Sequence, residues 1–183
     1  MGDPAGVGPE ICLRLLADAA IRDRGEPVIY GDLAVLGAAA AATGLPAPDP
    51  VRVRDFGAIA MDEFEPGTAS AATGAAGYAY VNGAIDDALA GKVAAVATAP
   101  LNKEALHAAG VPFPGHTEIF AARAGAGRAC MLQTCDIISA SFVTVHVGYA
   151  EVPGLLSVER IRDVIELTRD AMRRIRGREP KLV

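Results

Sequence analysis

The first ten residues, MGDPAGVGPE, limit the fold of this chain more than any other stretch. Three glycines and two prolines in ten residues make a tight, stiff loop. Pro9 suits the first turn of a helix, and Glu10 lies where the helix dipole favours an anion. Because a loop of this kind usually connects a strand to a helix, we expect a strand ahead of Met1 and a helix behind the loop.

Strand-like and helix-like segments alternate along the rest of the chain and predict an α/β fold with helices packed on a mostly parallel sheet. Hydrophobic residues make up 51% of the chain and aromatic residues only 5%, which suits such a sheet. The expected helices cover residues 9–21, 33–43, 70–91, 104–109, 119–124 and 158–176, with Thr117 and Ser157 as N-caps and Gly44, Gly91 and Gly177 at C-terminal ends. The expected strands cover residues 27–31, 51–54, 93–98, 129–134 and 141–147, and another starts at residue 179. We interpret the chain as a fragment of a longer α/β protein, truncated at both ends.

Charge, hydropathy and cysteine usage exclude several classes of protein. The net charge of −5 argues against a nucleic-acid partner, which needs a basic face. No apolar run is long enough to span a bilayer, and the N-terminus lacks the pattern of a signal peptide. Cys12, Cys130 and Cys135 have neither the number for a disulfide framework nor the spacing of a zinc site. We therefore expect reduced thiols in a cytoplasmic protein without a membrane partner.

Four loops at the expected ends of strands are rich in Gly, Pro and polar residues: GDPAGVGPE, TAPLNK, PGHTE and TVHVGYAEVP. In α/β sheets, ligands collect at the carboxyl ends of strands, so these loops predict a ligand site. The first loop is neither a GxGxxG motif nor a P-loop, although its glycines let the backbone approach a ligand closely.

The residue types in these loops leave alternatives open. Lys103 suits either a phosphate contact, a proton-transfer role or an ordinary first-turn lysine. His116 and Thr117 suit either a substrate site or a structural helix start. His146, at the end of the strand expected over residues 141–147, suits either a metal ligand or a structural histidine.

Taken together and in this order, GDPAGVGPE, ATAPLNKEALHAAG, PGHTE and TVHVGYAEVP resemble the 4-hydroxythreonine-4-phosphate dehydrogenase (PdxA) family of vitamin B6 biosynthesis. The resemblance runs over essentially the whole chain. The opening loop also resembles the GDGIGPE loop of isocitrate and isopropylmalate dehydrogenases, whose fold the family shares.

The resemblance implies NAD- or NADP-dependent oxidation of a phosphorylated hydroxy acid bound on a divalent metal such as Zn, Mg or Co. By position, His146 matches a metal histidine, and His116 and Thr117 match the substrate-binding pair. Lys103 matches a lysine to which we assign a catalytic proton-transfer or substrate role. Asp3 and Glu10 receive no specific role, and the cofactor-binding residues stay unassigned.

The family's chains are nearly twice as long, and the resemblance places the other two metal histidines after Val183. Residues 1–183 therefore correspond to the N-terminal portion of a two-lobed dehydrogenase, which forms a homodimer with active sites between subunits. The expected substrate is 4-phosphohydroxy-L-threonine, whose 3-keto product loses its carboxylate; 4-phospho-D-threonate or 4-phospho-D-erythronate is the alternative.

Two readings compete with a dehydrogenase. The first is a non-catalytic lobe that binds a phosphorylated ligand or pairs with itself, which the missing metal ligands favour. The second is an acyltransferase on a related scaffold, which the PGHTE and TVHVG loops fit less well than a dehydrogenase.

Overall fold

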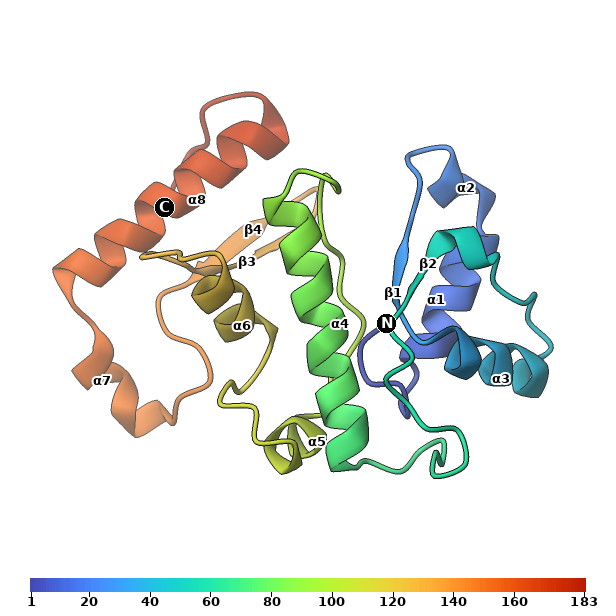
Figure 1. Cartoon of the computed structure of the whole chain (residues 1–183). Coiled ribbons are helices and arrows are strands. Elements are labelled where there is room, and N and C mark those ends of the chain that lie inside the picture. The colour runs from blue at the N-terminus through green and yellow to red at the C-terminus, as the bar shows by residue number, and fades with distance from the viewer. The chain divides into compact units, whose positions relative to one another are not determined.

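Two units, Met1–Ala124 and Gly125–Val183, make up the computed structural model, which describes residues 1–183 (Figure 1). Each unit combines helices with a short two-stranded sheet, so the mixed α/β class is confirmed. The sheet of the first unit is parallel and that of the second is antiparallel. The expected mostly parallel sheet is therefore present only as one parallel pair. No helix combines the length and the apolar character needed to cross a membrane.

The first unit is built around the long helix α4, which lies between α5 on one side and the parallel pair β1–β2 on the other (Figure 1). Its elements are α1 (Gly8–Ala17), α2 (Ala19–Arg22), β1 (Ile29–Gly31), α3 (Leu33–Thr43), the 3-10 helix η1 (Pro50–Arg52), β2 (Val53–Asp55), α4 (Ala71–Leu89), α5 (Lys103–Ala108) and α6 (His116–Arg123). Ile29 pairs with Val53 in the parallel ladder. The main core lies where α1, α3, β1 and α4 meet, and Leu13, Leu36 and Tyr80 are each at most 1% exposed there.

Asp87, near the end of α4, joins this helix to both strands. Its carboxylate accepts hydrogen bonds from Tyr30 Oη at 2.9 Å, from Lys92 Nζ at 3.0 Å and from the Arg54 guanidinium. Since these donors come from β1, β2 and the segment after α4, one carboxylate connects four parts of the unit.

The second unit is a hairpin packed against one long helix. Its elements are β3 (Met131–Thr134), β4 (Ser139–Phe142), the 3-10 helix η2 (Tyr149–Glu151), α7 (Val152–Leu155) and α8 (Val158–Arg176). Arg160 of α8 donates from Nε to Val143 O at 3.0 Å and from its Nη1 to Ala129 O at 2.9 Å. Ser157 caps α8 through a 3.0 Å bond from Arg160 N, and Gly177 ends it in the left-handed region, as the sequence predicts.

Two of the expected strands are absent, and a third ends early. Residues 93–98 and 179–183 form no strand, and β4 ends at Phe142 instead of continuing to residue 147. The physical reason is the absence of a neighbour, because a strand is defined by hydrogen bonds to another strand. The backbone of residues 93–98 makes no hydrogen bond, and β4 has only the four residues of β3 to pair with.

Candidate functional site

The first two predicted loops lie against each other. Asp3 N donates to Pro100 O at 2.9 Å, which ties the opening loop to the TAPLNK loop. Gly2 has a φ of +76°, and a Cβ at this position would come within 2.4 Å of Pro100 O. The buried carboxylate of Asp3 accepts a 3.0 Å bond from Ala5 N and so shapes the turn that follows. A side chain at position 2 would separate the two loops, which explains the glycine there.

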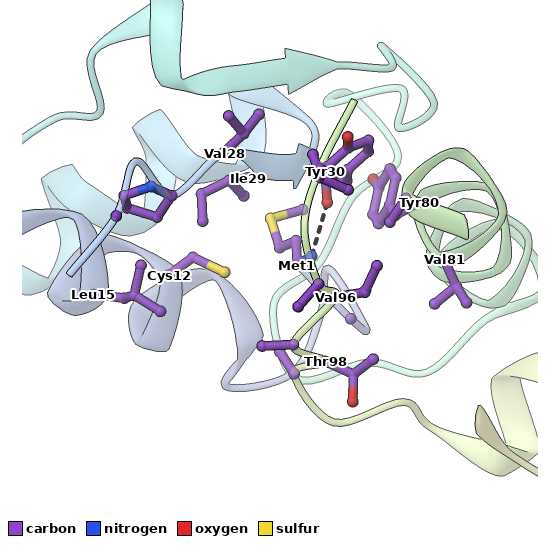
Figure 2. A pocket seen from close by; sticks show the side chains of 18 of the residues that line it. Met1, Cys12, Leu15, Val28, Ile29, Tyr30, Tyr80, Val81, Val96 and Thr98 are labelled. Carbon is purple, nitrogen blue, oxygen red and sulfur yellow. Dashed lines mark hydrogen bonds between the residues drawn. The ribbon is translucent and has the colours of Figure 1, made fainter. Parts of the chain in front are cut away.

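His116 brings the third predicted loop to the same place. It lines a cavity of about 700 Å³ together with Gly2 and Thr98, which belong to the first two loops. Figure 2 shows Thr98 and the neighbouring Met1 in this cavity. The Nε2 atom of His116 is buried and has no hydrogen-bond partner. Burial lowers the pKa of His116, and the Met1 ammonium lowers it further. The imidazole is therefore neutral at neutral pH, with one ring nitrogen available to a ligand.

Thr117 is not the N-cap of its helix, contrary to the sequence prediction. Helix α6 begins one residue earlier, at His116, and Gly115 is the N-cap, with an extended backbone and no side chain to cap. The half-buried Thr117 lies in the first turn of α6, beside His116.

Lys103 is the first residue of α5 and is exposed. Asn102 caps this helix by accepting a 3.0 Å bond from Ala105 N. The exposed Lys103 ammonium makes no ion pair and is therefore free at the end of the second loop.

His146 belongs to the second unit, and β4 ends four residues before it, so the expected position on a strand is wrong. It is exposed and has a φ of 58°, the only positive φ of a residue other than glycine. Such a conformation is uncommon for residues with a Cβ, although histidine adopts it more often than most. Backbone strain of this kind is often found at functional sites.

The chain's own residues do not make a complete metal site. No group of three or more His, Cys, Asp or Glu side chains is placed to hold a metal ion. His146 is thus a single donor, whereas zinc sites in proteins take three or four protein ligands.

Two buried polar groups of this region were missed by the sequence prediction. Asp32 is 1% exposed; its Oδ2 accepts a 2.6 Å bond from Ile59 N, while its Oδ1 has no partner. The Tyr80 hydroxyl is also buried without a hydrogen-bond partner, and burial, together with the nearby charge of Asp32, raises its pKa. The signal for Asp32 was its place directly after β1, at the carboxyl end of a strand, where the sequence analysis also expects the four loops.

Comparison with known proteins identifies the family. Residues 23–183 match the family described as Pyridoxal phosphate biosynthetic protein PdxA. The 4-hydroxythreonine-4-phosphate dehydrogenase of Desulfosudis oleivorans is 39% identical over 188 residues, which cover 94% of this chain and 55% of the relative. A relative from Bradyrhizobium diazoefficiens, provisionally named a D-threonate 4-phosphate dehydrogenase, is 39% identical over 196 residues, covering 100% of this chain and 56% of its own.

A solved structure agrees with the sequence relatives. The crystal structure of 4-hydroxythreonine-4-phosphate dehydrogenase from Klebsiella pneumoniae superposes with a TM-score of 0.84 at 32% identity. The match covers 96% of this chain and 57% of the solved one, so the chain spans little more than half the length of the proteins it matches. The chain belongs to the PdxA family of pyridoxal phosphate biosynthetic proteins.

Proposed function

We propose that this chain supplies the N-terminal part of a two-lobed, isocitrate/isopropylmalate dehydrogenase-like enzyme that oxidises a 4-phosphorylated hydroxy acid. When bound, NAD or NADP would accept a hydride from the alcohol carbon. The favoured substrate is 4-phosphohydroxy-L-threonine, whose 3-keto product loses its carboxylate on the route to pyridoxal 5'-phosphate. The names of the relatives support this substrate, and they support 4-phospho-D-threonate as the alternative.

The observation that carries the proposal is the unpartnered, buried Nε2 of His116 where three polar loops meet. A neutral imidazole donates or accepts one hydrogen bond without adding charge, which suits the recognition of a substrate hydroxyl. The adjacent Thr117 hydroxyl adds a neutral hydrogen-bond donor. The free Lys103 ammonium adds a cationic donor, which suits contact with a phosphate or transfer of a proton. We assign His116 and Thr117 to substrate binding and Lys103 to catalysis.

His146 is proposed as a metal ligand that needs further donors beyond those of this chain. Its strained backbone supports a functional role, because strain of this kind needs surrounding structure to maintain it. We propose that the remaining donors come from the rest of the catalytic unit, in a homodimer with active sites between subunits. Three free cysteines support the proposed cytoplasmic location.

The test compares His116→Gln with His107→Gln, since His107 is an exposed histidine of α5 and serves as a matched control. Binding of 4-phosphohydroxy-L-threonine is measured by calorimetry, and formation of NADH or NADPH is followed with added Zn²⁺, Mg²⁺ or Co²⁺. We expect His116→Gln to weaken binding by about tenfold or more, the effect of one hydrogen bond to a ligand, and His107→Gln to change nothing. Equal binding by both variants would remove His116 from the site.

A second candidate is a non-catalytic lobe that binds a phosphorylated ligand or dimerises. The absence of a complete metal donor set within the chain favours it. It predicts that the chain binds the phosphorylated acid equally well with and without added Zn²⁺, Mg²⁺ or Co²⁺, and that no reduced nicotinamide forms even when the rest of the catalytic unit is supplied.

A further inference from the structure

Asp32 occupies the N-cap position of α3 but does not cap this helix. An aspartate at an N-cap ordinarily accepts a hydrogen bond from a backbone N–H of the first helical turn. The Asp32 side chain makes no such bond. Leu33 N donates instead to Asp55 Oδ1 of β2 at 3.0 Å, so the neighbouring strand supplies an acceptor at the start of α3. The Asp32 carboxylate is therefore available for a contact elsewhere.

This carboxylate lies inside the protein, where only one of its two oxygens has a partner. Asp32 is 1% exposed, and its Oδ2 atom accepts a 2.6 Å bond from Ile59 N. Its Oδ1 atom is buried and accepts no hydrogen bond. Because a buried oxygen without a donor is costly, a donor from a neighbouring element is expected to complete it.

Tyr80 of α4 supplies a matching donor. Its hydroxyl is also buried without a partner, and its ring packs edge-on against Phe56, with 5.3 Å between the ring centroids. Phe56 lies in the same segment as Ile59, whose N–H binds the other oxygen of the carboxylate. Burial raises the pKa of the Tyr80 hydroxyl, and the neighbouring Asp32 carboxylate raises it further. A donor without an acceptor thus lies beside an acceptor without a donor.

The same face of α4 contacts the polar loops of the candidate site. Gly77 lies one helical turn before Tyr80 on this face. A Cβ at Gly77 would come within 3.3 Å of Gly2 O in the opening loop and 2.9 Å of Leu101 Cδ2 in the TAPLNK loop. Tyr80 itself lines the cavity that His116 also lines (Figure 2). The position of α4 therefore affects how all three loops meet.

We propose that Tyr80 and Asp32 are positioning residues of the candidate site: the Tyr80 hydroxyl donates a hydrogen bond to Asp32 Oδ1 and thereby fixes α4 against the three loops. This bond completes both buried groups, since each carboxylate oxygen then accepts from one donor. The two residues act through the contacts of α4 and not through contact with the substrate. The expected effect on substrate binding rests on the function proposed above, whereas the expected effect on His116 does not.

The test compares Tyr80→Phe with Tyr78→Phe in the full chain. Both variants remove one hydroxyl from α4, but the Tyr78 ring packs on another face of the helix, against Phe113. The pKa of His116 is measured by NMR, and binding of 4-phosphohydroxy-L-threonine is measured by calorimetry. We expect only Tyr80→Phe to raise the pKa of His116 toward its ordinary value, because loosened loops expose the imidazole to water. We also expect only this variant to weaken binding, by about fivefold or more.

Variants of Asp32 separate the hydrogen bond from a general loss of packing. In Asp32→Asn, the amide oxygen can accept from Ile59 N while the amide nitrogen donates to the Tyr80 oxygen. We therefore expect this variant to keep the His116 pKa close to that of the parent chain. Asp32→Ala loses both bonds, so we expect the His116 pKa to rise, and Tyr80→Phe in that background to raise it no further.

Three results would overturn the proposal: an unchanged His116 pKa in Tyr80→Phe, equal rises in Tyr80→Phe and Tyr78→Phe, or equal rises in Asp32→Asn and Asp32→Ala. A variant that only loses stability changes the midpoint of unfolding and leaves the pKa of His116 in the folded chain as it was. If the parent chain binds no 4-phosphohydroxy-L-threonine but Tyr80→Phe alone raises the His116 pKa, the proposed function fails and the positioning role is supported.

Discussion

Gly74 determines how closely α4 and α5 approach each other. A Cβ built at this position would lie 2.0 Å from Ala105 O and 2.3 Å from Ala105 C, both backbone atoms of α5. The two helices therefore touch backbone to backbone at this point. Since α5 begins with Lys103, this contact also positions the end of the TAPLNK loop.

We predict that Gly74→Ala destabilises the protein by about 1–3 kcal/mol, because neither backbone can move without disturbing its helix. Gly37→Ala is the matched control: Gly37 lies inside α3 and a Cβ there meets nothing within 4 Å. The control should instead stabilise the protein by about 0.4–1 kcal/mol through helix propensity and unfolded-state entropy. The free energies of unfolding of the two variants and the parent chain are measured by urea unfolding. Equal changes in the same direction for both variants would refute the close contact between α4 and α5.

At the scale of elements, local signals could be predicted from the sequence and non-local ones could not. Helix α3 begins and ends where the sequence predicts, because Gly44 ends it by its own left-handed conformation. Residues 93–98 have the composition of a strand but form none, because a strand needs a neighbour. The same contrast between local and non-local signals holds for the site. The motifs of the loops and their order along the chain identified three loops that meet in the structure. The buried, unpartnered atoms of Asp32 and Tyr80 depend on packing and left only a weak signal.

The Asp87 connection between α4, β1 and β2 gives the stability a pH dependence. Hydrogen bonds from Arg54, and then from Lys92 and Tyr30, hold the pKa of Asp87 well below its usual range. A carboxylate whose pKa is lower in the folded state stabilises the protein above the unfolded value of about 3.9. This stabilisation decreases as the pH falls below that value and is lost as the pH passes the folded pKa.

We therefore predict that Asp87→Asn lowers the free energy of unfolding near about pH 7, and that the difference from the parent chain shrinks near about pH 3. Asp86→Asn is the control, since it removes the same charge one residue earlier. Asp86 is exposed and pairs only with the exposed Arg123, a type of ion pair that contributes little. Urea unfolding at both pH values is the measurement. A pH-independent difference for Asp87→Asn would argue against the role of its charge.

At the scale of the whole molecule, burial is unevenly distributed between two helices of equal length. Helices α4 and α8 each have 19 residues, but ten of them are buried in α4 and two, Val164 and Met172, in α8. The apolar side of α8 is only partly covered, since Ile165 and Ile175 are 50% and 54% exposed. Since most helical stability in proteins comes from packing an apolar face, α8 is stabilised by less buried apolar contact than α4.

This difference predicts how the intact chain opens. Amides in the middle of α8 should exchange with solvent about an order of magnitude or more faster than those in the middle of α4, because α8 opens with less loss of buried apolar contact. Hydrogen exchange followed by mass spectrometry resolves the two helices in one experiment. Ser157→Ala, which removes the cap of α8 and costs about 1 kcal/mol, should speed exchange in α8 and leave α4 unchanged. Equal protection of both helices, or a response of α4 to the cap variant, would mean that the chain opens as one cooperative unit, and that the exposed stripe of α8 does not govern its stability.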